Sequence, residues 1–212
     1  FINVAQAMID ELVVSARVKW GQTPSLVLLL PHGHEGQGPD HSSGRLERFL
    51  SMAADTNMRI CNCTTAAQYF HLLRRQAALV NTDPLPLVIM TPKSLLRSAA
   101  VASSLQEFAE DEWHPVLDDV EARKHPDKIR RLIMCSGKVY YDLAGSDLAS
   151  RHPEVAITRM EQLYPFRVDR VQELIESYPG LEEVVWVQEE PENMGAWPYM
   201  RSRLESLVEG RC

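Results

Sequence analysis

Three histidines, His32, His34 and His41, lie within ten residues of one another and are the side chains best suited to chemistry. Imidazole titrates near neutral pH and both donates and accepts hydrogen bonds, so these residues suit proton transfer and anion binding. They directly follow the apolar run at 26–30, which is typical of a strand buried on both faces of a parallel sheet. Ligands of open α/β sheets bind at the carboxyl ends of strands, so the spacing predicts a binding or catalytic loop.

The same loop contains residues that would shape it around a ligand. Glycine allows left-handed backbone conformations and close approach, and short polar side chains orient a loop through bonds to its backbone. The residues concerned are Gly33, Gly36, Gly38, Asp40 and Ser42. Spacing alone leaves an exposed polar turn as the alternative. It argues against a metal site, because no cysteine or acid stands at an established zinc-ligand spacing, and against a dinucleotide fingerprint, whose glycine order differs.

Length and charge narrow the class of protein. The 212 residues, 45% of them hydrophobic, can bury a substantial core in one large domain or two small ones, and we favour two. A net charge of -7 with dispersed basic residues argues against a partner that is a nucleic acid. No apolar run reaches the length of a membrane span, and no signal peptide opens the chain. With only four cysteines, we expect reduced thiols and not a disulfide scaffold.

Strand and helix patterns alternate along the chain, which predicts an α/β fold with parallel sheets. The predicted strands lie at 26–30, 58–63, 86–91, 130–135, 154–159 and 183–188. The predicted helices lie at 44–54, 65–79, 138–150, 167–178 and 197–208, and helical spacing also opens the chain. Ser42 or Ser43 is expected to cap the helix at 44–54, and Thr64 or Thr65 the helix at 65–79. A charged stretch near 108–128 predicts an interdomain linker.

Six blocks of sequence carry a resemblance that covers nearly the whole chain. They are PHGHEGQGPDHSSGRLERFL at 31–50, FHLLRRQ at 70–76, TPKSLLR at 91–97, CSGKVYYDL at 135–143, RMEQLYPF at 159–166 and WVQEEPENMGAW at 186–197. In this order they closely resemble the 2-oxoglutarate dehydrogenase family, a group of thiamine-diphosphate-dependent decarboxylating enzymes in the transketolase-like superfamily.

The resemblance implies two transketolase-like, three-layer α/β/α domains with mainly parallel sheets. Residues 1–115 match the later part of the pyrimidine-binding domain for thiamine diphosphate, 116–128 a linker, and 129–212 the carboxyl-terminal domain. The diphosphate-binding domain, which holds most of the Mg²⁺ contacts in the family, has no counterpart in this sequence. Nor does the segment with the glutamate that activates the cofactor. We therefore expect a carboxyl-terminal fragment that is inactive alone.

The resemblance also implies an activity and partners. The enzyme would be a homodimeric oxidoreductase of the tricarboxylic acid cycle that decarboxylates 2-oxoglutarate on thiamine diphosphate. It would pass the succinyl group to the lipoyl domain of dihydrolipoyl succinyltransferase within a multienzyme complex. It would be cytoplasmic in a bacterium and in the mitochondrial matrix in a eukaryote. A 2-oxoadipate dehydrogenase, a 2-oxoglutarate decarboxylase and a noncatalytic dimerisation or regulatory module stay open as alternatives.

The resemblance ranks the candidate site residues. His41, in the GPDHSS block, matches a substrate-site histidine of the family and is the first candidate for a catalytic residue. His32 is the second, because transketolase-like enzymes carry another active-site histidine at this position. His34 is expected to be an exposed loop residue. Possible contacts to an anion, an interface or a regulator are Arg74, Arg75, Lys93 and Arg97.

Overall fold

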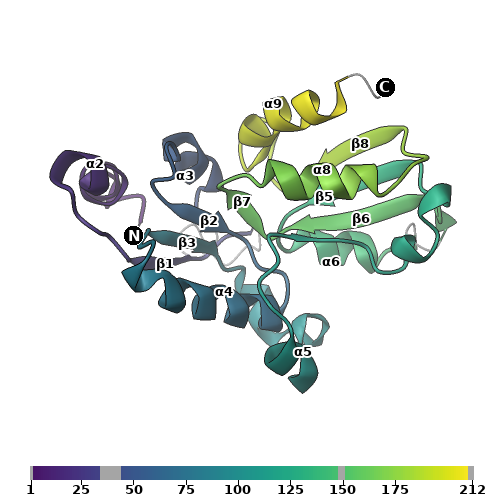
Figure 1. Ribbon diagram of the computed structural model, residues 1–212, viewed down its shortest axis with the longest axis horizontal. Helices are drawn as coiled ribbons and strands as arrows, with labels where there is room; N and C mark the ends of the chain where they lie inside the picture. Colours follow the sequence, from purple (N-terminus) through teal and green to yellow (C-terminus); the bar gives the residue numbers. More distant parts are fainter. Residues whose placement is uncertain (1, 34–43, 148–150, 210–212) are drawn as a thin grey trace.

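The computed structural model describes residues 2–33, 44–147 and 151–209. Its described strands form two four-stranded sheets that lie side by side, and helices cover both faces of each sheet (Figure 1). Four of the six pairings between these described strands are parallel. The α/β fold with mainly parallel sheets that the sequence predicts is therefore confirmed.

The first sheet has the strand order β1-β3-β2-β7. Strands β1 (Val27–Leu30) and β2 (Arg59–Cys61) both pair in parallel with β3 (Leu87–Met90). Helices α3 (Leu46–Met52) and α4 (Ala66–Ala78) lie on opposite faces of this sheet (Figure 1). The predicted cap of α4 is confirmed at Thr65, whose Oγ1 accepts a hydrogen bond from the backbone N–H of Gln68 at 3.2 Å.

The second sheet has the order β4-β6-β5-β8. Its central strands β5 (Arg131–Cys135) and β6 (Val155–Met160) are parallel, β8 (Glu183–Val187) is parallel to β5, and β4 (Val116–Leu117) is antiparallel to β6. Helix α6 (Val139–Ala144) covers one face, and α8 (Val168–Glu176) and α9 (Trp197–Val208) cover the other (Figure 1).

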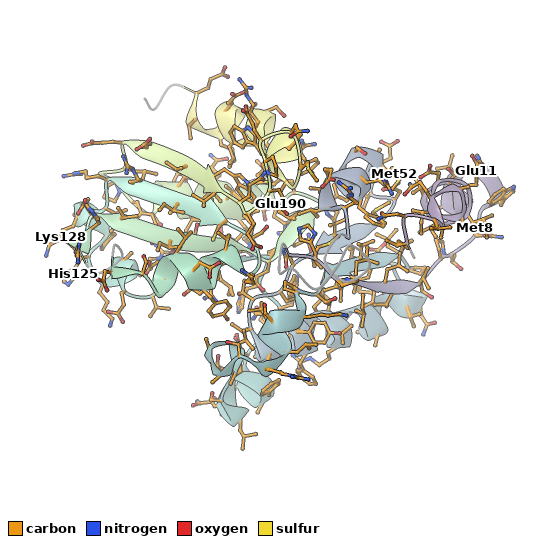
Figure 2. All side chains as sticks on the ribbon, turned by 180° about the vertical axis from the view of Figure 1, so that it is seen from behind. Met8, Glu11, Met52, His125, Lys128 and Glu190 are labelled. Atoms are coloured by element: carbon orange, nitrogen blue, oxygen red, sulfur yellow. The ribbon has the colours of Figure 1, made fainter. Side chains whose placement is uncertain are left out.

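Shorter helical segments complete the described chain. At its start lie α1 (Gln6–Met8), a π-helical segment (Ile9–Val14) and α2 (Ala16–Trp20), and Figure 2 shows Met8 and Glu11 of this region near Met52 of α3. Helix α5 (Leu105–Glu110) begins with a capping box between Ser104 and Glu107. Single 3-10 turns span Leu79–Asn81, Lys93–Arg97, Ala99–Val101, Ala122–Lys124 and Pro126–Lys128.

Strand β7 (Gln162–Tyr164) joins the two units. It follows β6 in the chain, yet it pairs antiparallel with β2 of the first sheet, with Ile60 opposite Tyr164. One buried apolar cluster likewise contains Ile60 and Met90 of the first sheet and Leu132 and Met134 of the second. The limits 1–115, 116–128 and 129–212 stay predictions, but the two units share a sheet and a core.

The structure corrects one expectation about an individual element and adds detail to two others. Strand β1 is at the edge of the described sheet and one of its faces is exposed, so the prediction that both faces are buried is wrong: Val27 is 37% exposed and Leu29 51%, whereas Leu30 is 5% exposed. The expected linker contains β4 and the last two 3-10 turns, because antiparallel pairing with β6 orders it. Helix α3 begins after Arg45, which has a left-handed φ of 53°, and the predicted caps Ser42 and Ser43 lie outside the described residues.

Candidate functional site

The described part of the histidine loop is its beginning, directly after β1. His32 and Gly33 are described, and Gly33 has a φ of 119°, which favours glycine. The other candidates of the loop lie outside the described residues: His34, Gly36, Gly38, Asp40, His41 and Ser42. The catalytic role expected for His41 therefore stays a prediction.

His32 is buried, with 6% of its surface exposed. Its Nε2 is hydrogen-bonded to Oε1 of Glu190, which follows β8 of the second unit. Its Nδ1 is also buried and has no hydrogen-bond partner among the described residues. Figure 2 shows Glu190 where the two sheets meet. A buried imidazole with one held nitrogen and one open nitrogen is a suitable group for accepting or donating a hydrogen bond to a ligand.

Glu190 is the site residue that the sequence did not indicate. Two consecutive acids at the end of a strand predict a polar surface between the units, and nothing in their spacing points to His32, which lies 158 positions earlier. The sequence does show that both residues follow predicted parallel strands. The carboxyl ends of such strands are the usual place for a ligand site.

A cavity of about 500 Å³ opens at the carboxyl ends of β1, β2 and β3. Its lining is mainly apolar and includes Leu29, Pro31, Tyr69 and Met90, together with the predicted contact residue Lys93. Ligand sites of open α/β sheets lie at this edge. Arg97, in contrast, is exposed and is not part of the lining.

A second cavity, of about 610 Å³, lies between α4, the segment at 112–118 and α8. The predicted contact residues Arg74 and Arg75 line it, and arginines from the second unit face the same space. The latter are Arg123, Arg167 and Arg170. The structure thus brings Arg74 and Arg75 together with further cations, and their proposed contact with an anion stays a prediction.

A buried polar cluster joins the units beside β7. Glu161 is completely buried and accepts hydrogen bonds from the backbone N–H and the Oγ1 hydroxyl of Thr64, both from the first unit. Arg159 Nη1 donates to the same hydroxyl oxygen at 3.1 Å, and the Tyr141 hydroxyl donates to the Thr64 carbonyl. Burial raises the pKa of Glu161 to about 7, against the opposing effects of Thr64 and Arg159. This carboxyl group therefore titrates near neutrality, inside the junction.

The three cysteines of the described ranges carry no sign of reactivity. Cys61, Cys63 and Cys135 are free thiols, as expected from their number. Burial raises the pKa of Cys135 to about 12 and also raises the pKa values of the other two. Thiolates are the reactive form, so these side chains act as small apolar groups.

Among the described residues, no three histidine, cysteine or acidic side chains gather as they would around a metal ion. No helix in the described ranges has the length and apolar character that a membrane span needs.

The chain is similar in sequence to known protein families and to individual proteins. Residues 1–99 match the family model for the pyrimidine-binding domain of transketolase, and residues 102–211 match that for the carboxyl-terminal part of 2-oxoglutarate dehydrogenase. Over 98% of its length the chain is 50% identical to the 2-oxoglutarate dehydrogenase E1 component of Shouchella clausii (strain KSM-K16) and 51% identical to that of Bacillus anthracis. The identity to the 2-oxoglutarate dehydrogenase E1 component of Bacillus cereus (strain B4264) is also 50%. The chain spans 22% of the length of these relatives.

Proposed function

This chain belongs to the 2-oxoglutarate dehydrogenase family, and we propose that it is the carboxyl-terminal part of a subunit that decarboxylates 2-oxoglutarate on thiamine diphosphate. The subunit would transfer the succinyl group to the lipoyl arm of dihydrolipoyl succinyltransferase, within the tricarboxylic acid cycle. The observation that carries this proposal is 50% identity to an E1 component over 98% of the chain.

The described residues fit the pyrimidine half of thiamine diphosphate. An apolar cavity at the carboxyl ends of three parallel strands suits a planar aromatic ring. His32 is not among the residues that line this cavity, but its buried Nδ1 has no partner within the described ranges and calls for a polar one. The coenzyme, when bound, would supply a nucleophilic carbon for the keto group and a sink for the electrons left by carbon dioxide.

The chain's own residues would bind anions and handle protons. His41 is the proposed group for hydrogen bonding to the substrate, and His32 is the proposed group on the cofactor side. Neither histidine could replace the groups that bind the diphosphate and Mg²⁺, which we assign to polypeptide outside this sequence. We therefore propose that activity needs the full-length homodimer and that the 212-residue chain alone is inactive. A bacterial cytoplasm or a mitochondrial matrix is the proposed location.

The substrate is tested by steady-state turnover of the full-length protein on five-carbon and six-carbon 2-oxo diacids. The expected result is a higher kcat/KM for 2-oxoglutarate and formation of succinyl-lipoyl product in the presence of the succinyltransferase. A decisive preference for the six-carbon acid would assign the protein to 2-oxoadipate instead. Release of the free aldehyde without succinyl transfer would assign a decarboxylase.

The role of the loop is tested by His41→Ala in the full-length enzyme. We expect a fall in kcat of roughly 100-fold or more, the usual range for losing a positioned acid or base. His152→Ala is the matched control, because the His152 side chain is 52% exposed. Unchanged turnover in a folded His41→Ala protein would remove His41 from the mechanism.

A further inference from the structure

His32 and Glu190 form a buried pair that bridges the two units. Each side chain is only 7% exposed, and the residues come from the ends of strands in different sheets. Removing an acid and an imidazole from water is costly, and a well-packed apolar pair would join the units at least as well. The pair therefore calls for a reason other than holding the units together.

The chemistry of the pair restricts what His32 can do. A carboxylate accepts hydrogen bonds and donates none, so the ring nitrogen bonded to Glu190 must carry a hydrogen. That nitrogen is Nε2. The lone pair of the neutral ring then lies on Nδ1, the buried atom that has no partner among the described residues. A buried polar atom without a partner destabilises the folded chain, and a ligand bound at Nδ1 would offset that cost.

The segment that carries Glu190 is held rigidly. The side-chain amide of Gln188 donates to the backbone oxygens of Glu190 at 3.2 Å and Met194 at 2.8 Å, and its oxygen accepts from the backbone N–H of Trp197 at 2.8 Å. It makes two further bonds, to the Trp186 ring nitrogen and the Pro191 carbonyl. A single side chain thus ties the end of β8, the turn after it and the start of α9 together.

Gly195 also helps to position the carboxyl group of Glu190. It has a φ of 65°, and a Cβ atom there would stand 2.8 Å from both Cδ and Oε2 of Glu190. Its backbone N–H donates to Oε2 of Glu47 at 3.1 Å, which anchors the turn to α3 of the first unit. The missing side chain leaves the space in which the carboxyl group lies.

We propose that Glu190 is a positioning residue that holds the proton of His32 on Nε2, so that the Nδ1 lone pair is presented to the bound cofactor or substrate. This inference rests on the proposed function, and it assigns to the carboxyl-terminal unit a part in the site of the pyrimidine unit. Carboxylates orient catalytic imidazoles in this way in hydrolases and metal sites, where an amide in their place permits the wrong tautomer.

The kinetic test uses the full-length holoenzyme with Glu190→Gln, His32→Asn and the double variant. Glu192→Gln is the matched control, because Glu192 is exposed on the same turn. We expect Glu190→Gln to lower kcat roughly 10- to 100-fold, with the KM for 2-oxoglutarate within about three-fold of wild type. The kcat of the double variant should be no lower than that of His32→Asn alone, because both changes remove the same oriented imidazole. Additive losses, or a kcat equal to that of the control, would overturn the proposal.

A second readout does not depend on activity. Nitrogen-15 NMR of the cofactor-free, full-length protein labelled in histidine reports the tautomer, with His32→Asn identifying the signals. We expect the neutral imidazole of the wild type to carry its hydrogen on Nε2 and none on Nδ1, and a mixture of the two tautomers in Glu190→Gln. An unchanged His32 spectrum in that variant would refute the positioning role. If the wild type shows the expected tautomer but turns over no 2-oxo acid, the proposed function fails and the pairing stands.

Discussion

Replacing Glu161 by glutamine is expected to remove a pH dependence of stability that this buried carboxyl group imposes. Its pKa is raised by burial from 4.5 to about 7. Below about pH 4.5 the group is protonated in both the folded and the unfolded chain and has no effect. As pH rises from there, the unfolded chain loses the proton first, so the free energy of unfolding falls until the pH passes about 7.

The size of the effect follows from the two pKa values. At 1.36 kcal/mol per pKa unit, the complete loss amounts to about 3 kcal/mol, of which about 2.5 kcal/mol falls between about pH 5 and pH 8. A glutamine at this position keeps the shape, and its amide oxygen can still accept from the backbone N–H of Thr64. It does not titrate, so this part of the pH dependence should disappear.

The assay is urea unfolding of the 212-residue chain at a series of pH values, followed by the fluorescence of its four tryptophans. The quantity compared is the change in the free energy of unfolding between about pH 5 and pH 8, in wild type and in Glu161→Gln. Histidines and surface acids contribute equally to both proteins and cancel in the difference. Equal pH slopes for the two proteins would refute the reasoning.

Two further substitutions test the local geometry. Gly195→Ala should lower the free energy of unfolding by at least about 1–2 kcal/mol and reduce the kcat of the full-length enzyme as Glu190→Gln does. Gly21→Ala is the control: Gly21 has a φ of 62° and open space around an added Cβ, so this change measures the cost of the backbone conformation alone. Thr65→Ala should cost about 1 kcal/mol in urea unfolding, because the N-terminus of α4 loses its cap, whereas Thr65→Ser should retain most of the stability; equal losses in both would contradict the capping role.

Local patterns were sufficient for most of the fold. Helix α9 has the predicted limits of 197–208, and Thr65 caps α4 as its position before a helical pattern predicts. These features depend on residues within a few positions of one another. The edge position of β1 could not be predicted, because a continuous apolar run has the same appearance in a central and in an edge strand.

Contacts between distant parts of the chain could not be predicted from sequence patterns. Strand β7 has three residues, too few for a period to be recognised, and its partner β2 lies about a hundred positions earlier. The contact between His32 and Glu190 spans 158 positions. Sequence reasoning could place each residue at the end of a strand, but which two ends meet depends on how the sheets are oriented.

The position of β7 also sets a rule for exchanging parts between relatives. A chimaera joined near residue 100, where the two family matches meet, would set β7 of one parent against β2 of the other. The carboxyl group of Glu161 would then have to find Thr64 in a foreign partner. Compatible parents are therefore those in which β2, β7 and the Thr64–Glu161 contact are inherited as one set, whatever the identity of the remaining sequence.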